Sequence, residues 1–207
     1  MATRIGADAT AMRKQPSQTR SRATVEAILV AGAQVLAQVG WTKFTTNRVA
    51  EAAGTSIGSL YQYFPNKAVL IEAIIQRHFD DVRSVLRRAD RDDLETRARG
   101  RLLVDGMIEI HNINPRLHNV LLHDVPARGA LEAAHVAFKA DYLSFYERLI
   151  ASAFSETPAV DIQVAARVLA SAVAAVIHDA AHDGTLSSPL LRAELVRLTL
   201  GYLRKRP

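Results

Sequence analysis

The sequence predicts an all-α protein, and three features of the 207-residue chain support that prediction. Ala, Leu, Val and Arg dominate wherever apolar residues recur at helical spacing, and most of these residue types favour helices. The seven prolines and ten glycines fall at intervals that mark the ends of such segments. Apolar residues make up 49% of the chain, which is enough to bury a substantial core.

Positive charge is concentrated in the first third of the chain. Residues 1–67 carry eight Lys/Arg and three Asp/Glu, whereas the other 140 residues carry 18 of each sign. This third therefore supplies the whole net charge of +5, and a field of that sign attracts polyanions. Residues 1–22 contain basic and small polar residues without an apolar period, which predicts a flexible basic arm.

Several features predict a cytoplasmic protein without membrane contact. The chain has no cysteine, which excludes a disulfide framework and a thiolate metal site. The first 22 residues lack the apolar segment of a secretory signal. The longest weakly charged apolar run, residues 164–177, is interrupted by Arg167 and is shorter than the ~20 residues of a membrane span.

Two helices are expected directly after the arm. The first covers about residues 23–39 and ends at Gly40, because glycine tolerates the left-handed backbone that follows many helices. Thr45 is a suitable N-cap for a second, short helix at about residues 46–53.

A third helix is expected to begin after Ser56, which caps it. Its buried stripe is predicted to contain Ile57, Leu60 and Phe64. Its outward face combines small or polar residues with two flanking tyrosines, namely Gly58, Ser59, Gln62, Tyr61 and Tyr63. Residues 23–66 therefore have the pattern of a helix-turn-helix domain of three helices.

The remaining residues, 67–207, are expected to form a second helical domain. Pro65 ends the third helix because it disfavours helical geometry in the residue before it. Asn66 is placed to cap a linking helix at residues 67–89. Prolines mark the later boundaries, and further helices are expected at about 92–112, 115–124, 128–155, 160–183 and 189–205.

The segment FTTNRVAEAAGTSIGSLYQYFPNK, Phe44 to Lys67, resembles the DNA-binding signature of TetR/AcrR-type transcriptional regulators. In that family an Ala-Gly turn precedes a recognition helix with a Leu-Tyr-x-Tyr-Phe-like end, and a lysine follows. Arg48 is a departure, since many members have an acid there. The resemblance implies a homodimeric repressor that binds double-stranded DNA and is released by a small-molecule effector.

In a helix-turn-helix protein, the outer face of the recognition helix reads the major groove and its margins hold phosphates. We expect Gly58, Ser59 and Gln62 to face base edges. The full set of expected DNA-binding residues is Thr45, Arg48, Ser56, Gly58, Ser59, Tyr61, Gln62, Tyr63 and Lys67. Arg13, Lys14, Arg20 and Arg22 of the arm are expected to add phosphate or minor-groove contacts. A two-fold symmetric protein of this kind selects a palindromic operator.

The last two helices are expected to form the dimer interface. The helix at 160–183 is apolar nearly all round, so both its own domain and a second subunit are expected to cover it. The family resemblance places the interface in the same region. The expected interface residues are Val168, Ala172, Val176, Leu191, Leu195, Leu198 and Tyr202.

A mostly apolar effector pocket is expected in residues 92–183. The helix at 128–155 carries rings and hydrogen-bonding groups along one seam, a mixture that orients a small molecule in an apolar cavity. The same seam also suits plain core packing, and the family resemblance is the reason to expect an effector here. The expected pocket residues are Met107, His111, Leu121, His135, Phe138, Tyr142, Phe145 and His178.

Two motifs raise an enzyme as an alternative. Residues 54–58 match the G-x-S-x-G of serine hydrolases, but that motif needs a preceding strand and an Ala-rich helix precedes it here. His178 and His182 have a metal-binding spacing, but Asp179 stands where H-E-x-x-H has glutamate, which favours plain hydrogen-bonded histidines near a helix end. We therefore expect no enzyme and no cofactor, and assign no catalytic or metal residue. A helical module that binds an acidic partner is the other alternative.

Overall fold

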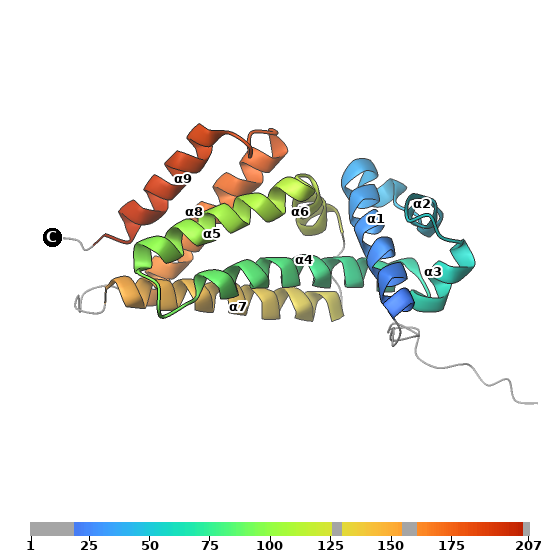
Figure 1. Cartoon of the computed structure of the whole chain (residues 1–207), viewed down its shortest axis with the longest axis horizontal. Helices are drawn as coiled ribbons and strands as arrows, with labels where there is room; N and C mark the ends of the chain where they lie inside the picture. The colour runs from blue at the N-terminus through green and yellow to red at the C-terminus, as the bar shows by residue number, and fades with distance from the viewer. Residues whose placement is uncertain (1–18, 126–129, 155–160, 205–207) are drawn as a thin grey trace, which may run out of the picture. The chain divides into compact units, whose positions relative to one another are not determined.

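The computed structural model describes residues 19–125, 130–154 and 161–204. Every regular element in this part of the chain is a helix (Figure 1), which confirms the predicted all-α class. The chain divides into two compact units between Arg77 and His78. We refer to them as unit 1 and unit 2. Arg13 and Lys14 of the predicted arm lie outside the described residues, whereas Arg20 and Arg22 belong to the first helix.

Unit 1 contains α1 (Thr19–Lys43), α2 (Thr46–Ala52), α3 (Ile57–Tyr63) and the beginning of α4 (Lys67–Ala89). The first helix begins before Ala23, so the last residues of the predicted arm are helical. Gly40 interrupts α1 with φ 71° and ψ 174°, at the predicted end of the helix. A Cβ at Gly32 would lie 2.6 Å from Cδ1 of Ile74, so α1 and α4 pack closely at this position.

The inner face of α3 differs from the predicted one. Leu60 and Phe64 are fully buried as expected, but Ile57 is 37% exposed, so its predicted burial is wrong. Tyr63, predicted to flank the outer face, is only 7% exposed. The reason is that the helix ends at Tyr63, and Phe64 has extended backbone before Pro65. Phe64 therefore leaves the helical period, and Tyr63 packs inward beside Leu60.

Unit 2 contains the rest of α4 and the elements α5 (Thr96–Ile113), α6 (Leu117–Asn119), η1 (Val120–Asp124), α7 (Ala130–Ala153), α8 (Ile162–His182) and α9 (Pro189–Tyr202). These elements fall within the five predicted ranges, apart from one residue at the end of α5. The range 115–124 is not one helix, because a short α-helical turn passes into the π-helical segment η1.

The core of unit 2 is apolar and draws on α4, α5, α7, α8 and α9. Figure 1 shows α7 running along α4, and the rings of Phe79 and Phe138 stack between these helices at 4.1 Å. Helix α8 supplies buried Leu169, Val173 and Ile177 to the core. This packing holds the helices that carry most of the predicted effector residues.

A buried arginine joins the end of α4 to α5 and α7. Arg99 is 4% exposed, and its Nε donates to the carbonyl oxygen of Ala89 at 3.1 Å. Its Nη2 lies 2.6 Å from a carboxylate oxygen of Asp90, whose other oxygen lies 2.6 Å from Arg148. The Arg99 guanidinium therefore satisfies a buried carbonyl at the end of α4, and the Asp90 carboxylate pairs with both arginines.

Two helical stretches, Ser21–Lys43 and Ile162–His182, are long and apolar enough to cross a membrane by length and composition alone. This is weak evidence for a membrane protein, because the core helix of a soluble protein passes the same test. Residues of both stretches, such as Ile28 and Leu169, are fully buried against other helices.

Candidate functional site

Local capping sets the positions of α2 and α3. The side chain of Thr45 accepts a hydrogen bond from the backbone N–H of Arg48 at 3.3 Å, as expected for the N-cap of α2. The side chain of Ser56 accepts one from the N–H of Ser59 at 3.0 Å. Gly54, with φ 62°, allows the tight turn between them. The structure therefore has the predicted two short helices separated by a turn.

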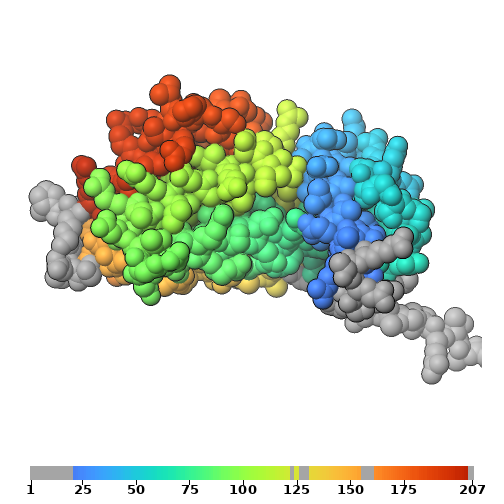
Figure 2. All heavy atoms as spheres, viewed as in Figure 1, coloured from blue at the N-terminus to red at the C-terminus, as the bar shows by residue number. Residues whose placement is uncertain are grey.

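The outer face of α3 is small and polar. Gly58 and Gln62 are exposed, and Figure 2 shows the segment of α2 and α3 in light blue and cyan at the surface of unit 1. Tyr61 is 41% exposed, and its hydroxyl lies 3.0 Å from Oγ1 of Thr46. Ser59 is half-buried, with its hydroxyl 2.9 Å from that of Ser56. The bond between Tyr61 and Thr46 ties α3 to α2.

Lys67 has a structural partner in the same unit. Its Nζ donates to the carbonyl oxygen of Trp41 at 3.0 Å and lies 3.6 Å from the centre of the Trp41 ring. Partial burial lowers the pKa of the Lys67 ammonium. The Lys67 ammonium therefore satisfies a carbonyl near the C-terminal end of α1 and makes a cation–π contact with the Trp41 ring. Thr45 and Arg48 are exposed, unlike Tyr63.

The predicted seam of α7 packs on its neighbours. Phe145 is fully buried, whereas Phe138 is half-buried and stacks on Phe79. The hydroxyls of Tyr142 and Tyr146 lie 3.2 Å apart, and burial raises the pKa of Tyr142 to about 12. The ring of His135 meets that of Phe79 edge-on at 5.0 Å. These rings form one aromatic group, which we call the aromatic seam.

A second group consists of histidines from four elements. His78 of α4, His111 of α5 and His118 of α6 are all buried, and each offers a ring nitrogen within 4.8 Å of the other two. Nε2 of His78 and Nδ1 of His118 are 2.8 Å apart. His178 of α8 stacks on His118 with ring centres 3.8 Å apart. We call His78, His111 and His118 the histidine cluster.

Burial keeps two histidines of this cluster uncharged. Desolvation, together with smaller effects of the nearby His111 and His178, lowers the pKa of His78 to about 3. Desolvation also lowers the pKa of His111, against a smaller opposing effect of its bond to the Met107 carbonyl. Both imidazoles are therefore neutral at pH 7 and carry a lone pair on one ring nitrogen.

The sequence predicted only part of this arrangement. His111 and His178 were expected to face an effector, and the centres of their rings lie 5.5 Å apart. Met107 and Leu121 are buried as well. His78 and His118 were not predicted as site residues. His78 fits the pattern of the inner face of the linking helix, and His118 has no ligand spacing to another histidine. His182 is exposed, whereas His178 stacks on His118 of the cluster.

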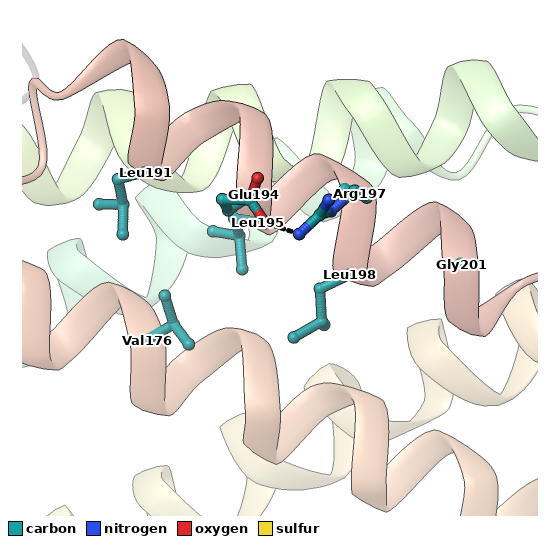
Figure 3. Close-up of a pocket in the computed structure, with 7 residues that line it drawn as sticks. All are labelled: Val176, Leu191, Glu194, Leu195, Arg197, Leu198 and Gly201. Atoms are coloured by element: carbon teal, nitrogen blue, oxygen red, sulfur yellow. Dashed lines mark hydrogen bonds and ion pairs between the residues drawn. The ribbon is translucent and has the colours of Figure 1, made fainter.

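The outer surface of α8 and α9 is apolar. Val164 and Val168 of α8 are 57% and 48% exposed, and Leu198 of α9 is 41% exposed. A groove of about 450 Å³ lies between these helices, and Figure 3 shows side chains of α9 directed from that helix toward Val176. Leu195 is only 2% exposed, so this predicted interface residue packs within its own chain. The groove is lined by Val176, Leu191, Glu194, Leu195, Arg197, Leu198 and Gly201.

Comparison with known protein families covers most of the chain. A model described as bacterial regulatory proteins of the tetR family matches residues 28–74. A model described as tetracyclin repressor-like, C-terminal domain, matches residues 96–203. The first match contains α2 and α3, and the second extends from α5 to α9.

Solved structures and curated proteins agree with these matches. A TetR transcription regulator from Haloarcula marismortui is 19% identical, with a TM-score of 0.70 over 87% of this chain and 96% of its own. SmeT in complex with triclosan is 25% identical, with a TM-score of 0.67 over 86% and 90%. The nucleoid occlusion factor SlmA of Haemophilus ducreyi is 33% identical over 40% of this chain, and the match spans only 41% of that protein.

Proposed function

Because this chain belongs to the TetR family of bacterial regulatory proteins, we propose that it is a repressor that a small molecule releases from a palindromic operator in the cytoplasm. The matched family is described as bacterial regulatory proteins. The observation that carries the proposal is the capped helix pair α2 and α3, whose outer face is exposed, small and polar. Such a face enters the major groove without steric obstruction.

In this proposal the residues of unit 1 have different roles in DNA binding. Gly58 and Gln62 approach base edges, with Ser59 beside them. Thr45, Arg48 and Tyr61 hold phosphates, because they are polar and exposed at the margins of the helix pair. Lys67 adds positive charge near the end of α1. Ser56 acts through its cap, and Tyr63 supports α3 from within.

The active form is a homodimer that pairs the exposed face of α8 and α9 with the same face of a second copy. Val168, Val176 and Leu198 are the residues we assign to the contact, with Ala172, Leu191 and Tyr202 beside them. The support is the apolar surface of these helices and the groove between them. A four-helix contact of this kind gives the two-fold symmetry that a palindromic operator requires.

The effector binds in unit 2 against the aromatic seam. Phe138 and Tyr142 are half-buried, so they retain surface that an apolar molecule would cover. Met107, Leu121 and Phe145 support the seam from the core. Of the similar proteins, SmeT is described in complex with triclosan. The linking helix α4 is the proposed route of the signal, since it continues from the DNA-binding unit into unit 2.

Selection from random duplex DNA tests the DNA-binding part directly. We expect the unmodified protein to enrich a palindrome, and Gln62→Ala to relax the preference at one base step in each half-site. Gln163→Ala is the matched control, because Gln163 is an exposed glutamine of unit 2. Unchanged base preference in Gln62→Ala would remove α3 as the reading helix. Failure to enrich any sequence would favour the alternative of an acidic protein partner.

A further inference from the structure

We propose that the histidine cluster, His78, His111 and His118, binds a divalent transition-metal ion such as Zn²⁺ inside unit 2. These side chains come from three separate elements, α4, α5 and α6, and each of the three histidines is buried. Imidazole nitrogen is a preferred ligand of zinc, and three such ligands with one open position form a known type of zinc site.

The orientation of His111 is that of a metal ligand. Its Nδ1 lies 2.8 Å from the carbonyl oxygen of Met107 and therefore donates to it. Its other nitrogen, Nε2, is buried and has no hydrogen-bond partner among the described residues. Ligating histidines in proteins usually donate the non-ligating N–H to a carbonyl or carboxylate, which fixes the tautomer and the ring direction. Without such a ligand, a buried nitrogen that has lost its hydrogen bonds to water is unfavourable.

His78 and His118 already approach each other through ring nitrogens, the atoms that would bind the metal ion. Nε2 of His78 and Nδ1 of His118 are 2.8 Å apart, so they share one proton as a hydrogen bond. Two nitrogens bound to one tetrahedral zinc ion at ~2.05 Å are about 3.4 Å apart. Replacing the shared proton by a metal ion therefore requires the two rings to separate by only a little over half an ångström. Small side-chain rotations provide such a shift.

The fourth position is open for a solvent molecule or for a donor atom of an effector. The three-residue group contains no carboxylate, so it lacks the general base of a hydrolytic zinc site. His178 lies against the cluster, stacked on His118.

Metal binding would also act on α4. His78 belongs to α4, which begins at Lys67 directly after the helix-turn-helix. An ion held by His78, His111 and His118 would fix α4 against α5 and α6. We infer that the ion changes operator affinity, and this regulatory part rests on the proposed function.

Titration of the purified chain with Co²⁺, followed by displacement with Zn²⁺, tests the site without any DNA. The protein carries no histidine tag and is first treated with a chelator. We expect one Co²⁺ per chain with the visible absorption of a tetrahedral site. His111→Asn should weaken binding by about 100-fold or more, because loss of a second-shell partner alone costs 10–100-fold. The Asn amide can still donate to the Met107 carbonyl, which preserves the local fold.

Two further variants make the test decisive. His78→Gln removes a second ligand from a different helix and should give the same loss, so the conclusion does not depend on the folding of one variant. His182→Asn is the control, since this exposed histidine lies outside the cluster. Absence of stoichiometric Co²⁺ binding would show that the cluster is a hydrogen-bonded core. Loss of binding in His182→Asn alone would assign the metal to His178 and His182 instead, and either result overturns the site.

Operator binding with and without Zn²⁺ tests the regulatory part separately. We expect a change in operator affinity for the unmodified protein and none for His111→Asn. An unchanged affinity in the metal-loaded protein would refute the coupling. Absence of any operator binding in chelator would count against the proposed function, while the Co²⁺ titration would still decide the metal site.

Discussion

A charge on the exposed face of α8 should separate the proposed dimer without unfolding the protomer. We choose Val168→Asp, because Val168 is 48% exposed and lies on the face of α8 that is turned away from the core of unit 2. The same change at Leu195 would be uninformative. Leu195 is 2% exposed within its own chain, and a carboxylate there would destabilise the protomer itself.

The size of the effect follows from the exposed fraction of Val168. Full burial of a valine side chain contributes about 1.5–3 kcal/mol, so covering the exposed half contributes about 1 kcal/mol per protomer. Desolvating an unpaired carboxylate at a partly wet interface adds about 2 kcal/mol or more. Two protomers contribute to one dimer, so the total is about 6 kcal/mol. This corresponds to an increase of about 10⁴-fold in the dissociation constant of the dimer.

Sedimentation velocity over a range of protein concentrations measures the change. Val136→Asp is the matched control, because Val136 of α7 is 66% exposed and lies outside the proposed interface. We expect Val168→Asp to be a folded monomer with weak operator binding, and Val136→Asp to remain dimeric. If Val168→Asp sediments as a dimer at micromolar concentration, the face of α8 and α9 is not the interface.

Three further predictions concern stability and DNA binding. Gly40→Ala should lower the free energy of unfolding by about 1–3 kcal/mol in urea titration, because φ 71° with ψ 174° is a region that only glycine adopts readily. Gly58→Ala should leave stability unchanged or slightly higher but weaken operator binding, since an added Cβ meets only Oγ of Ser56, at 3.8 Å. An unaltered operator affinity in Gly58→Ala would mean that DNA does not approach this side of α3. Arg99→Met should cost about 3 kcal/mol, because a buried ion pair loses one partner while Arg148 keeps the other oxygen of Asp90. The exposed Arg101→Met is its control, and equal unfolding midpoints for the two variants would contradict the role of Arg99.

Local signals made the helix-turn-helix predictable. Thr45 and Ser56 cap the helices that follow them, and Asn66 accepts a hydrogen bond from the N–H of Val69 at the start of α4. Each cap joins residues three positions apart, so it can be predicted from the local sequence. The errors at Ile57 and Tyr63 arose where the helical period was extended across the residue before Pro65.

The histidine cluster could not be read from the sequence, because its members come from different helices. His78, His111 and His118 share no short metal-binding spacing, and only tertiary packing brings their ring nitrogens within 4.8 Å. The pair His178 and His182 shows the opposite case. It has the four-residue spacing of a metal site, yet His178 stacks on His118 and His182 is exposed. Spacing along one helix is therefore a poor guide in a fold whose sites form between helices.

The two proposed ligand groups of unit 2 meet at adjacent residues of α4. His78 belongs to the histidine cluster, and Phe79 stacks on Phe138 of the aromatic seam. A helix is stiff over one residue, so His78 cannot shift along or about the helix axis without moving Phe79 as well. A metal ion at the cluster and an apolar molecule at the seam would therefore act on the same segment of α4. Their effects on operator affinity should be coupled, so each ligand alters the affinity of the other by the same factor.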